Sequence, residues 1–172
     1  MEFRVFVSHS VGPEENALPW RLQTLAAAHG IKVYVARPPK PQYQIGQSGF
    51  DHAKKEVRRE IKRSDCVLAL ITNLSQTSRR ALEEELNTAI ELQKPIIPII
   101  EKGLVNDALA RSLSGKGVPL FVLWSDGNVG QVEKEVAQFL EKRNLSKEIR
   151  QAVSGLVALA VGLLLLSAVS SE

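Results

Sequence analysis

The sequence predicts an α/β fold, in which a five-stranded, parallel, doubly wound sheet is followed by a C-terminal apolar helix. Short apolar runs rich in branched residues alternate with amphipathic helical stretches along most of the chain. In the centre, Cys66 to Thr72 is typical of a strand buried on both faces, and Ile96 to Ile100 of a second such strand after an intervening helix. Residues 152–169 are then uncharged and apolar on all sides of the expected helix.

The elements follow from local signals. Gly30 ends a first helix as a C′ glycine, Thr77 or Ser78 can cap the central helix, and Pro95 stops it. Trp20 and Trp124 are expected in the core. The predicted strands are 3–8, 31–36, 66–72, 96–100 and 120–124, and the other helices are 17–29, 51–62, 104–113 and 129–141. This alternation resembles the flavodoxin-like strand order. We therefore divide the chain into a domain of residues 1–142, a charged hinge of residues 143–151, and a hydrophobic helix of residues 152–169.

The central helix carries three consecutive glutamates. At about 100° per residue, Leu82, Leu86 and Ala89 gather on one face. Only Glu85 borders this stripe, because it lies three residues after Leu82 and four before Ala89. Glu85 can then be partly desolvated near the ends of the strands, as an active-site acid would be. The alternative is a solvated charge run near a helix N-terminus, where the helix dipole favours acidic residues.

Composition excludes several functions. The net charge is +3, and the charges alternate along the helices without a basic run between aromatics, so nucleic-acid binding is not indicated. The single cysteine, Cys66, lies in an apolar strand, which fits a reducing cytoplasm. Three scattered histidines and one cysteine do not suit a zinc site, and we expect no metal. No secretory signal is expected, because residues 4–8 have the pattern of a strand.

Known catalytic motifs are missing from the sequence. No GxGxxG follows a strand, and neither GxxxxGK[ST] nor GxSxG occurs. The first strand leads into Ser8-His9-Ser10 and the third into Thr72-Asn73, so the acidic residues of a phospho-receiver are missing there. Rossmann dehydrogenases, P-loop enzymes, α/β-hydrolases and receivers are therefore disfavoured.

A long connection follows the second strand. Arg37 to Gly49 contains three prolines, Tyr43 and Gly46. Long loops in compact domains are often functional, and this one is expected to control assembly and access to a site. A merely tolerated insertion is the alternative.

The C-terminal segment has the composition of a membrane anchor. Eighteen apolar residues are the lower limit for a span, and Ser154, Ala158 and Gly162 form a small-xxx-small face. Four basic residues precede the segment, which predicts a cytoplasmic N-terminal domain tethered to the inner membrane. On this interpretation, a chain truncated after Arg150 stays folded and soluble. The alternative is a helix buried against protein in an assembly.

Taken in order, these features resemble a Toll/interleukin-1 receptor (TIR) domain over roughly residues 1–142. The matching segments are VFVSHS from Val5, IKRSDCVLALI from Ile61, SRRALEEEL from Ser78 and KPIIPI from Lys94. The chain departs from the family in two places. Ala81 stands where a tryptophan often precedes the catalytic glutamate, and Ala36-Arg37 stands where an acidic residue often follows the second strand.

The resemblance implies an activity and a site. Many bacterial TIR domains cleave NAD⁺ to nicotinamide and ADP-ribose or a cyclised product, and their catalytic glutamate matches Glu85. NAD⁺ would be the substrate, with no further cofactor. The expected substrate-binding residues are Ser8, His9, Ser10, Arg37, Tyr43 and Gly46. The resemblance also implies self-association that switches activity on, and a role in anti-phage immunity. A non-catalytic TIR adaptor acting through homotypic contacts, or another nucleotide enzyme with a glutamate nucleophile, remains an alternative.

Overall fold

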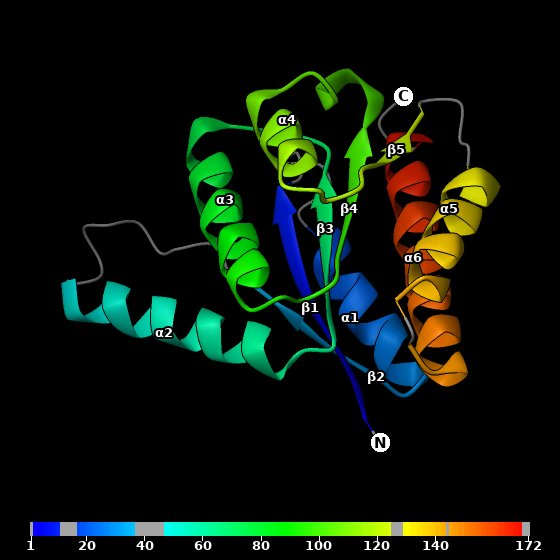
Figure 1. Cartoon of the computed structure of the whole chain (residues 1–172), viewed down its shortest axis with the longest axis horizontal. Helices are drawn as coiled ribbons and strands as arrows, with labels where there is room; N and C mark the ends of the chain where they lie inside the picture. The colour runs from blue at the N-terminus through cyan, green and yellow to red at the C-terminus, as the bar shows by residue number, and fades with distance from the viewer. Residues whose placement is uncertain (1, 11–16, 37–46, 125–128, 144, 170–172) are drawn as a thin grey trace.

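Five strands form a single parallel sheet in the order β2-β1-β3-β4-β5, which confirms the predicted fold class (Figure 1). The computed structural model describes residues 2–10, 17–36, 47–124, 129–143 and 145–169. The strands are β1 (Phe3–Ser10), β2 (Ile31–Val35), β3 (Cys66–Ile71), β4 (Ile96–Glu101) and β5 (Phe121–Leu123). The helices are α1 (Leu18–Ala28), α2 (Gln47–Arg63), α3 (Gln76–Glu91), the 3-10 turn η3 (Lys102–Leu104), α4 (Ala108–Gly115), α5 (Val129–Glu141) and α6 (Lys147–Val169).

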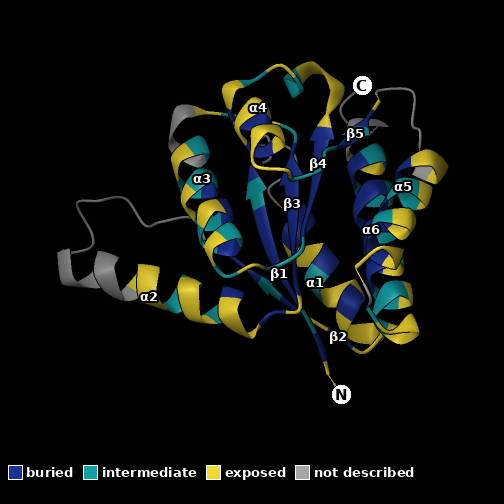
Figure 2. Ribbon diagram, in the orientation of Figure 1, coloured by how far each residue is buried: buried dark blue, intermediate teal, exposed yellow. Residues whose placement is uncertain are grey.

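The helices cover the two faces of the sheet in two groups. Helices α2, α3 and α4 lie on one face, and α1, α5 and α6 lie on the other (Figure 1). Because successive side chains of a strand point to opposite faces, Phe6 joins the α3 side and Val7 joins the α1 side. All six residues of β3 are buried, as expected for a central strand with helices on both sides (Figure 2).

Helix α6 forms part of the core of this domain. Its inward face packs against α1 and α5 (Figure 2). The six buried residues are Val153, Leu156, Val157, Ala160, Val161 and Leu164. The same helix is long and apolar enough to cross a membrane between Lys147 and Leu166, although a third of that stretch is buried against the domain. It begins at Lys147, so residues 147–151 of the predicted hinge are its first turns.

Several element ends differ from the sequence-based expectation. Strand β1 continues through Ser10, because His9 and Ser10 pair with Leu70 and Ile71 of β3. Helix α2 begins at Gln47 rather than Asp51.

Two further helices also differ from the expectation. Helix α3 begins at Gln76, which places Thr77 and Ser78 inside its first turn instead of at a cap. The predicted helix 104–113 is instead η3 followed by α4, which begins after Asp107.

Both tryptophans are exposed, and the prediction that they belong to the core was wrong. Trp20 is 40% exposed and Trp124 is 42% exposed. Strand β5 has only three residues, so Trp124 lies beyond its last paired position, where the Lys102 ammonium approaches to 3.5 Å from the ring centroid. Trp20 falls on the outer side of α1, whose inner side is formed by Leu18, Leu22 and Ala26.

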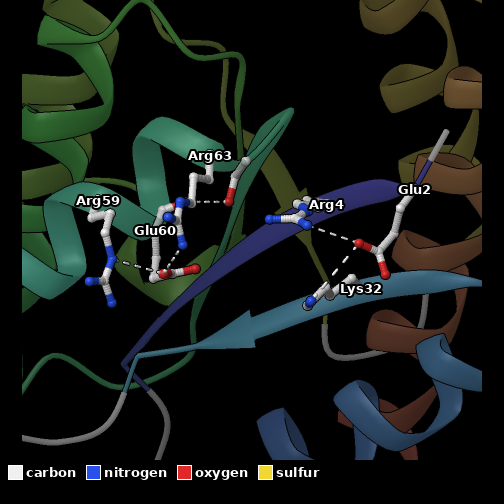
Figure 3. Close-up of polar contacts among 7 residues, drawn as sticks. Glu2, Arg4, Lys32, Arg59, Glu60 and Arg63 are labelled. Carbon is white, nitrogen blue, oxygen red and sulfur yellow. Dashed lines mark hydrogen bonds and ion pairs between the residues drawn. The ribbon is translucent and has the colours of Figure 1, made fainter.

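Two groups of ion pairs lie at the amino ends of the strands, away from the carboxyl edge. Figure 3 shows Glu2 facing Arg4 of β1 and Lys32 of β2, at 3.0 and 3.9 Å. At the end of α2, Glu60 lies 3.4 Å from Arg59 and 3.5 Å from Arg63 (Figure 3). Such exposed pairs contribute about 0–1 kcal/mol each, so we assign them no part in the site.

Candidate active site

Two of the three consecutive glutamates of α3, Glu84 and Glu85, point in different directions. Glu84 is exposed, and its carboxylate lies 3.6 Å from the Lys54 ammonium of α2. Glu85 is half-buried and borders the stripe formed by Leu82, Leu86 and Ala89, as the helical spacing predicts. Of these two adjacent carboxylates, only that of Glu85 is therefore turned toward the sheet.

Ser8 of β1 meets Glu85 at the carboxyl edge of the sheet. The Ser8 hydroxyl donates a hydrogen bond to Oε2 of Glu85, which joins residues 77 positions apart in the sequence. Strand β1 lies between β2 and β3, and the strand order reverses at β1 and β3. In open α/β sheets, ligands bind at such a switch point, outside the carboxyl ends of the strands.

The surroundings of Glu85 favour its neutral form. Burial in the domain raises the pKa of this carboxyl from its ordinary value to about 7, and the Ser8 hydrogen bond opposes the rise. Glu84 adds a smaller unfavourable charge. Glu85 can therefore change its charge near neutral pH, which is a property of functional carboxylates.

Ser10 supports the site from the same face of β1. It is buried, and its hydroxyl donates to the backbone carbonyl of Asn73, in the connection between β3 and α3. The backbone N–H groups of Thr72 and Asn73 in turn donate to the Ser10 carbonyl. Ser8 and Ser10 were both expected to bind substrate, but their buried hydroxyls bond to α3 and to the segment before it.

His9 lies on the other side of the strand. The alternation that turns Ser8 and Ser10 toward α3 turns His9 toward the α1 face. Its Nε2 lies 3.2 Å from the Ala36 carbonyl, and because a carbonyl only accepts, Nε2 carries the proton. Burial lowers the pKa of this imidazole, so neutral pH leaves it uncharged. His9 thus holds the end of β2 and is not brought together with Glu85.

The other expected site residues are not placed by the structure. Arg37, Tyr43 and Gly46 lie outside the described residues. Across the described ranges there is no group of three or more histidine, cysteine, aspartate or glutamate side chains that could hold a metal ion. Cys66 is buried in β3, and burial raises the pKa of its thiol to about 12, so it is unsuited to nucleophilic chemistry.

An ion pair that the sequence analysis missed fixes the start of α3. Arg79 makes two contacts with Asp107, and the Nη2–Oδ2 distance is 2.7 Å. Asp107 also caps α4 by accepting from the Leu109 N–H at 2.9 Å, and its pKa is lowered chiefly by the Arg79 hydrogen bond. The capping aspartate before Ala108 is a signal that could have revealed the start of α4.

A surface groove lies far from these residues. It has a volume of about 520 Å³ and is lined only by α5 and α6, including Lys134, Lys147 and Arg150. None of its lining residues comes from a strand or from α3, so we do not associate it with Glu85.

A family model for the TIR domain matches residues 5–140 of the chain. The chain belongs to the TIR domain family. No curated protein matches it. The matched region contains α3 and most of β1, and therefore includes both Ser8 and Glu85 of the TIR domain.

Two solved structures are similar to the chain at low identity. The TIR domains of the activated Roq1 resistosome, which directly recognises the pathogen effector XopQ, are 17% identical with a TM-score of 0.42, covering 92% of this chain and 83% of theirs. A protein from Klebsiella pneumoniae described as a quinone reductase is 10% identical with a TM-score of 0.43, covering 94% and 85%. Both TM-scores are below 0.5, and we base no conclusion on either.

The raised pKa of Glu85 predicts a pH-dependent stability of the TIR domain. Between pH 4.5 and about 7, the folded protein keeps a proton that the unfolded chain releases. The Glu85 contribution to the free energy of unfolding therefore falls as pH rises through this window, by about 3 kcal/mol at most. We expect Glu85→Gln to gain stability over the wild type from pH 5 to pH 8 in chemical denaturation. Subtracting the wild-type curve of unfolding free energy against pH from that of Glu85→Gln removes the opposing effect of His9. A difference between the two proteins that does not vary with pH would contradict the raised pKa of Glu85.

Proposed function

We propose that this TIR domain is an NAD⁺ glycohydrolase or cyclase that cleaves the nicotinamide–ribose bond, with Glu85 as its catalytic residue. The observation that carries the proposal is the half-buried Glu85 carboxylate, turned toward the sheet at the β1/β3 switch point and hydrogen-bonded to Ser8. Membership in the TIR family supports NAD⁺ as the substrate, because the resemblance aligns Glu85 with the family's catalytic glutamate.

The reaction requires little from the protein beyond a well-placed negative charge. Cleavage breaks the bond between ribose C1′ and the pyridinium nitrogen, and the bonding electrons neutralise that nitrogen as nicotinamide leaves. No general acid is needed for this leaving group. The ribose develops oxocarbenium character, which an ionised Glu85 can stabilise while accepting hydrogen bonds from ribose hydroxyls. Water then attacks C1′ and releases a proton to give ADP-ribose, or an adenine nitrogen attacks to give a cyclic product.

Self-association is the proposed switch. In the family, the loop after the second strand often completes a neighbour's site, and here that loop is the proline-rich segment from Arg37. A second copy of the chain is therefore the expected partner, and anti-phage immunity is the proposed setting. A non-catalytic adaptor that uses the same homotypic contacts is the competing function.

The proposed location is the cytoplasmic side of the inner membrane, with α6 as the tether. Four basic residues precede the apolar run, namely Lys142, Arg143, Lys147 and Arg150, and they would remain on the cytoplasmic side. Anchoring would require the inward face of α6 to leave α1 and α5 and would expose their apolar surfaces, so burial of α6 within the domain is the competing arrangement. Cell fractionation of the full chain tests this, because recovery entirely in the soluble fraction would exclude the tether.

The decisive assay is incubation of concentrated full-length protein with NAD⁺, followed by quantification of nicotinamide. We expect the rate of nicotinamide release to rise more steeply than in proportion to protein concentration, because assembly precedes catalysis. ADP-ribose and its cyclic forms are separated in the same chromatogram. If NAD⁺ stays intact at all concentrations and under several assembly conditions, the adaptor function is favoured.

A further inference from the structure

We propose that Ser8 is a positioning residue that orients the Glu85 carboxylate and favours its ionised form, instead of binding the substrate. This role rests on the proposed function of Glu85. It replaces the expectation from the sequence that Ser8 forms part of the substrate-binding wall.

The burial of Ser8 argues against direct contact with a ligand. Ser8 has no exposed surface, and its hydroxyl donates to Oε2 of Glu85. The bond is made to Oε2, and we assign the acceptance of a ribose hydroxyl to Oε1. A buried donor of this kind acts on the reaction through the carboxylate that it holds.

The donor sits on a rigid part of the fold. Ser8 is paired with Ala69 of β3, and the preceding Val7 is paired with both Val35 of β2 and Leu68 of β3. The helix that carries Glu85 is fixed by its neighbours Leu82 and Leu86, which are buried in the core between α3 and the sheet. A strand fixed on both sides and a packed helix therefore define the position of the carboxylate.

The charged groups around Glu85 do not supply this stabilisation. On α3 itself, Glu84 disfavours a second negative charge. From α2, Lys54 and Arg58 lie against Glu84 and Glu91 instead. His9 of β1 lies on the other face, and the residues of β3 and β4 on the α3 side are apolar (Val67, Ala69, Ile71, Ile96, Ile100). Among the described groups, the Ser8 hydroxyl is the one found to favour ionised Glu85.

The direct test is a titration of Glu85 in protein carrying carbon-13 in its glutamate carboxyl groups, read by NMR. Loss of the hydroxyl in Ser8→Ala should raise the Glu85 pKa by about one pH unit, the equivalent of one hydrogen bond to the ionised form. Ser8→Thr keeps the donor and should restore the wild-type value. The matched control is Thr88→Ala, which removes from α3 a hydroxyl that donates to the Glu84 backbone carbonyl and should leave the Glu85 titration unchanged.

Catalysis provides the second measurement. The pH at which nicotinamide release is half-maximal should rise in Ser8→Ala by the same amount as the titration, with KM for NAD⁺ little changed. If Ser8→Ala does not fold, Ser8→Cys retains a weak donor of similar shape and should give a smaller rise. A Glu85 titration that is unmoved in folded Ser8→Ala or Ser8→Cys, or a change in KM alone, would overturn the role of Ser8. Absence of nicotinamide release in the wild type counts against the proposed function instead.

Discussion

Glu85→Gln is expected to abolish nicotinamide release while leaving the fold intact. The glutamine side chain has nearly the same shape, and its carbonyl oxygen can still accept from Ser8, but it lacks the negative charge that stabilises the oxocarbenium ion. Removing a group that stabilises charge in the transition state typically lowers the rate by about 10²-fold or more. The measurement is nicotinamide release at equal protein concentration under assembling conditions.

Glu84→Gln is the matched control for this variant. It removes the same charge from the adjacent position of the same helix, where the carboxylate is exposed and faces Lys54 of α2. Its activity should stay close to that of the wild type, because Glu84 has only a minor effect on the Glu85 pKa, and its free energy of unfolding should change by no more than about 0.5 kcal/mol. Comparable nicotinamide release from Glu85→Gln and the wild type would refute the catalytic assignment.

Removal of α6 is expected to destabilise the TIR domain severely, contrary to the expectation that truncation after Arg150 leaves it folded. The truncated chain lacks all six buried side chains of α6 and exposes the apolar surfaces of α1 and α5 beneath them. Each of the five larger side chains, which are valines and leucines, contributes roughly 1.5–3 kcal/mol, so the loss is on the order of the stability of a whole domain. Thermal unfolding and light scattering of the truncated chain measure the effect.

A pair of point variants separates the core role of α6 from a membrane role. Val157→Asp places a carboxylate at a fully buried position and should lower the free energy of unfolding by about 3 kcal/mol or more. Leu166→Asp places the same charge at a side chain that is 66% exposed and should leave the stability of the soluble domain almost unchanged. Suppose that both variants have the wild-type free energy of unfolding and that both are lost from the membrane fraction to the same extent. In that case α6 acts as an anchor and does not cover the sheet.

Much of the fold could be predicted from the sequence because its signals are local. A buried strand such as Cys66–Ile71 is apolar at every position, and Pro95 and Gly30 mark helix ends through backbone chemistry that needs no partner. The 3.6-residue period of α3 also sufficed to single out Glu85 from its neighbours, since the direction of a helical side chain depends only on spacing.

The partners of these residues were decided by the tertiary structure. Ser8 meets Glu85 across 77 positions because the parallel sheet brings the end of β1 beside α3. Pairing with β3 extended β1 by two residues, and the strand alternation then placed His9 on the face opposite to Ser8 and Ser10. No local pattern shows how far a strand continues, because that depends on the neighbour with which it pairs.

The sequence of α6 by itself established a long apolar helix and could not establish what covers it. A helix that is apolar on all sides satisfies its backbone internally and can be buried equally well in lipid or against protein. Its contacts with α1 and α5 are formed only when the sheet has brought these helices to the same face. The composition of α6 thus shows that this helix must be buried. Only the assembled domain provides the surface of α1 and α5 that buries it.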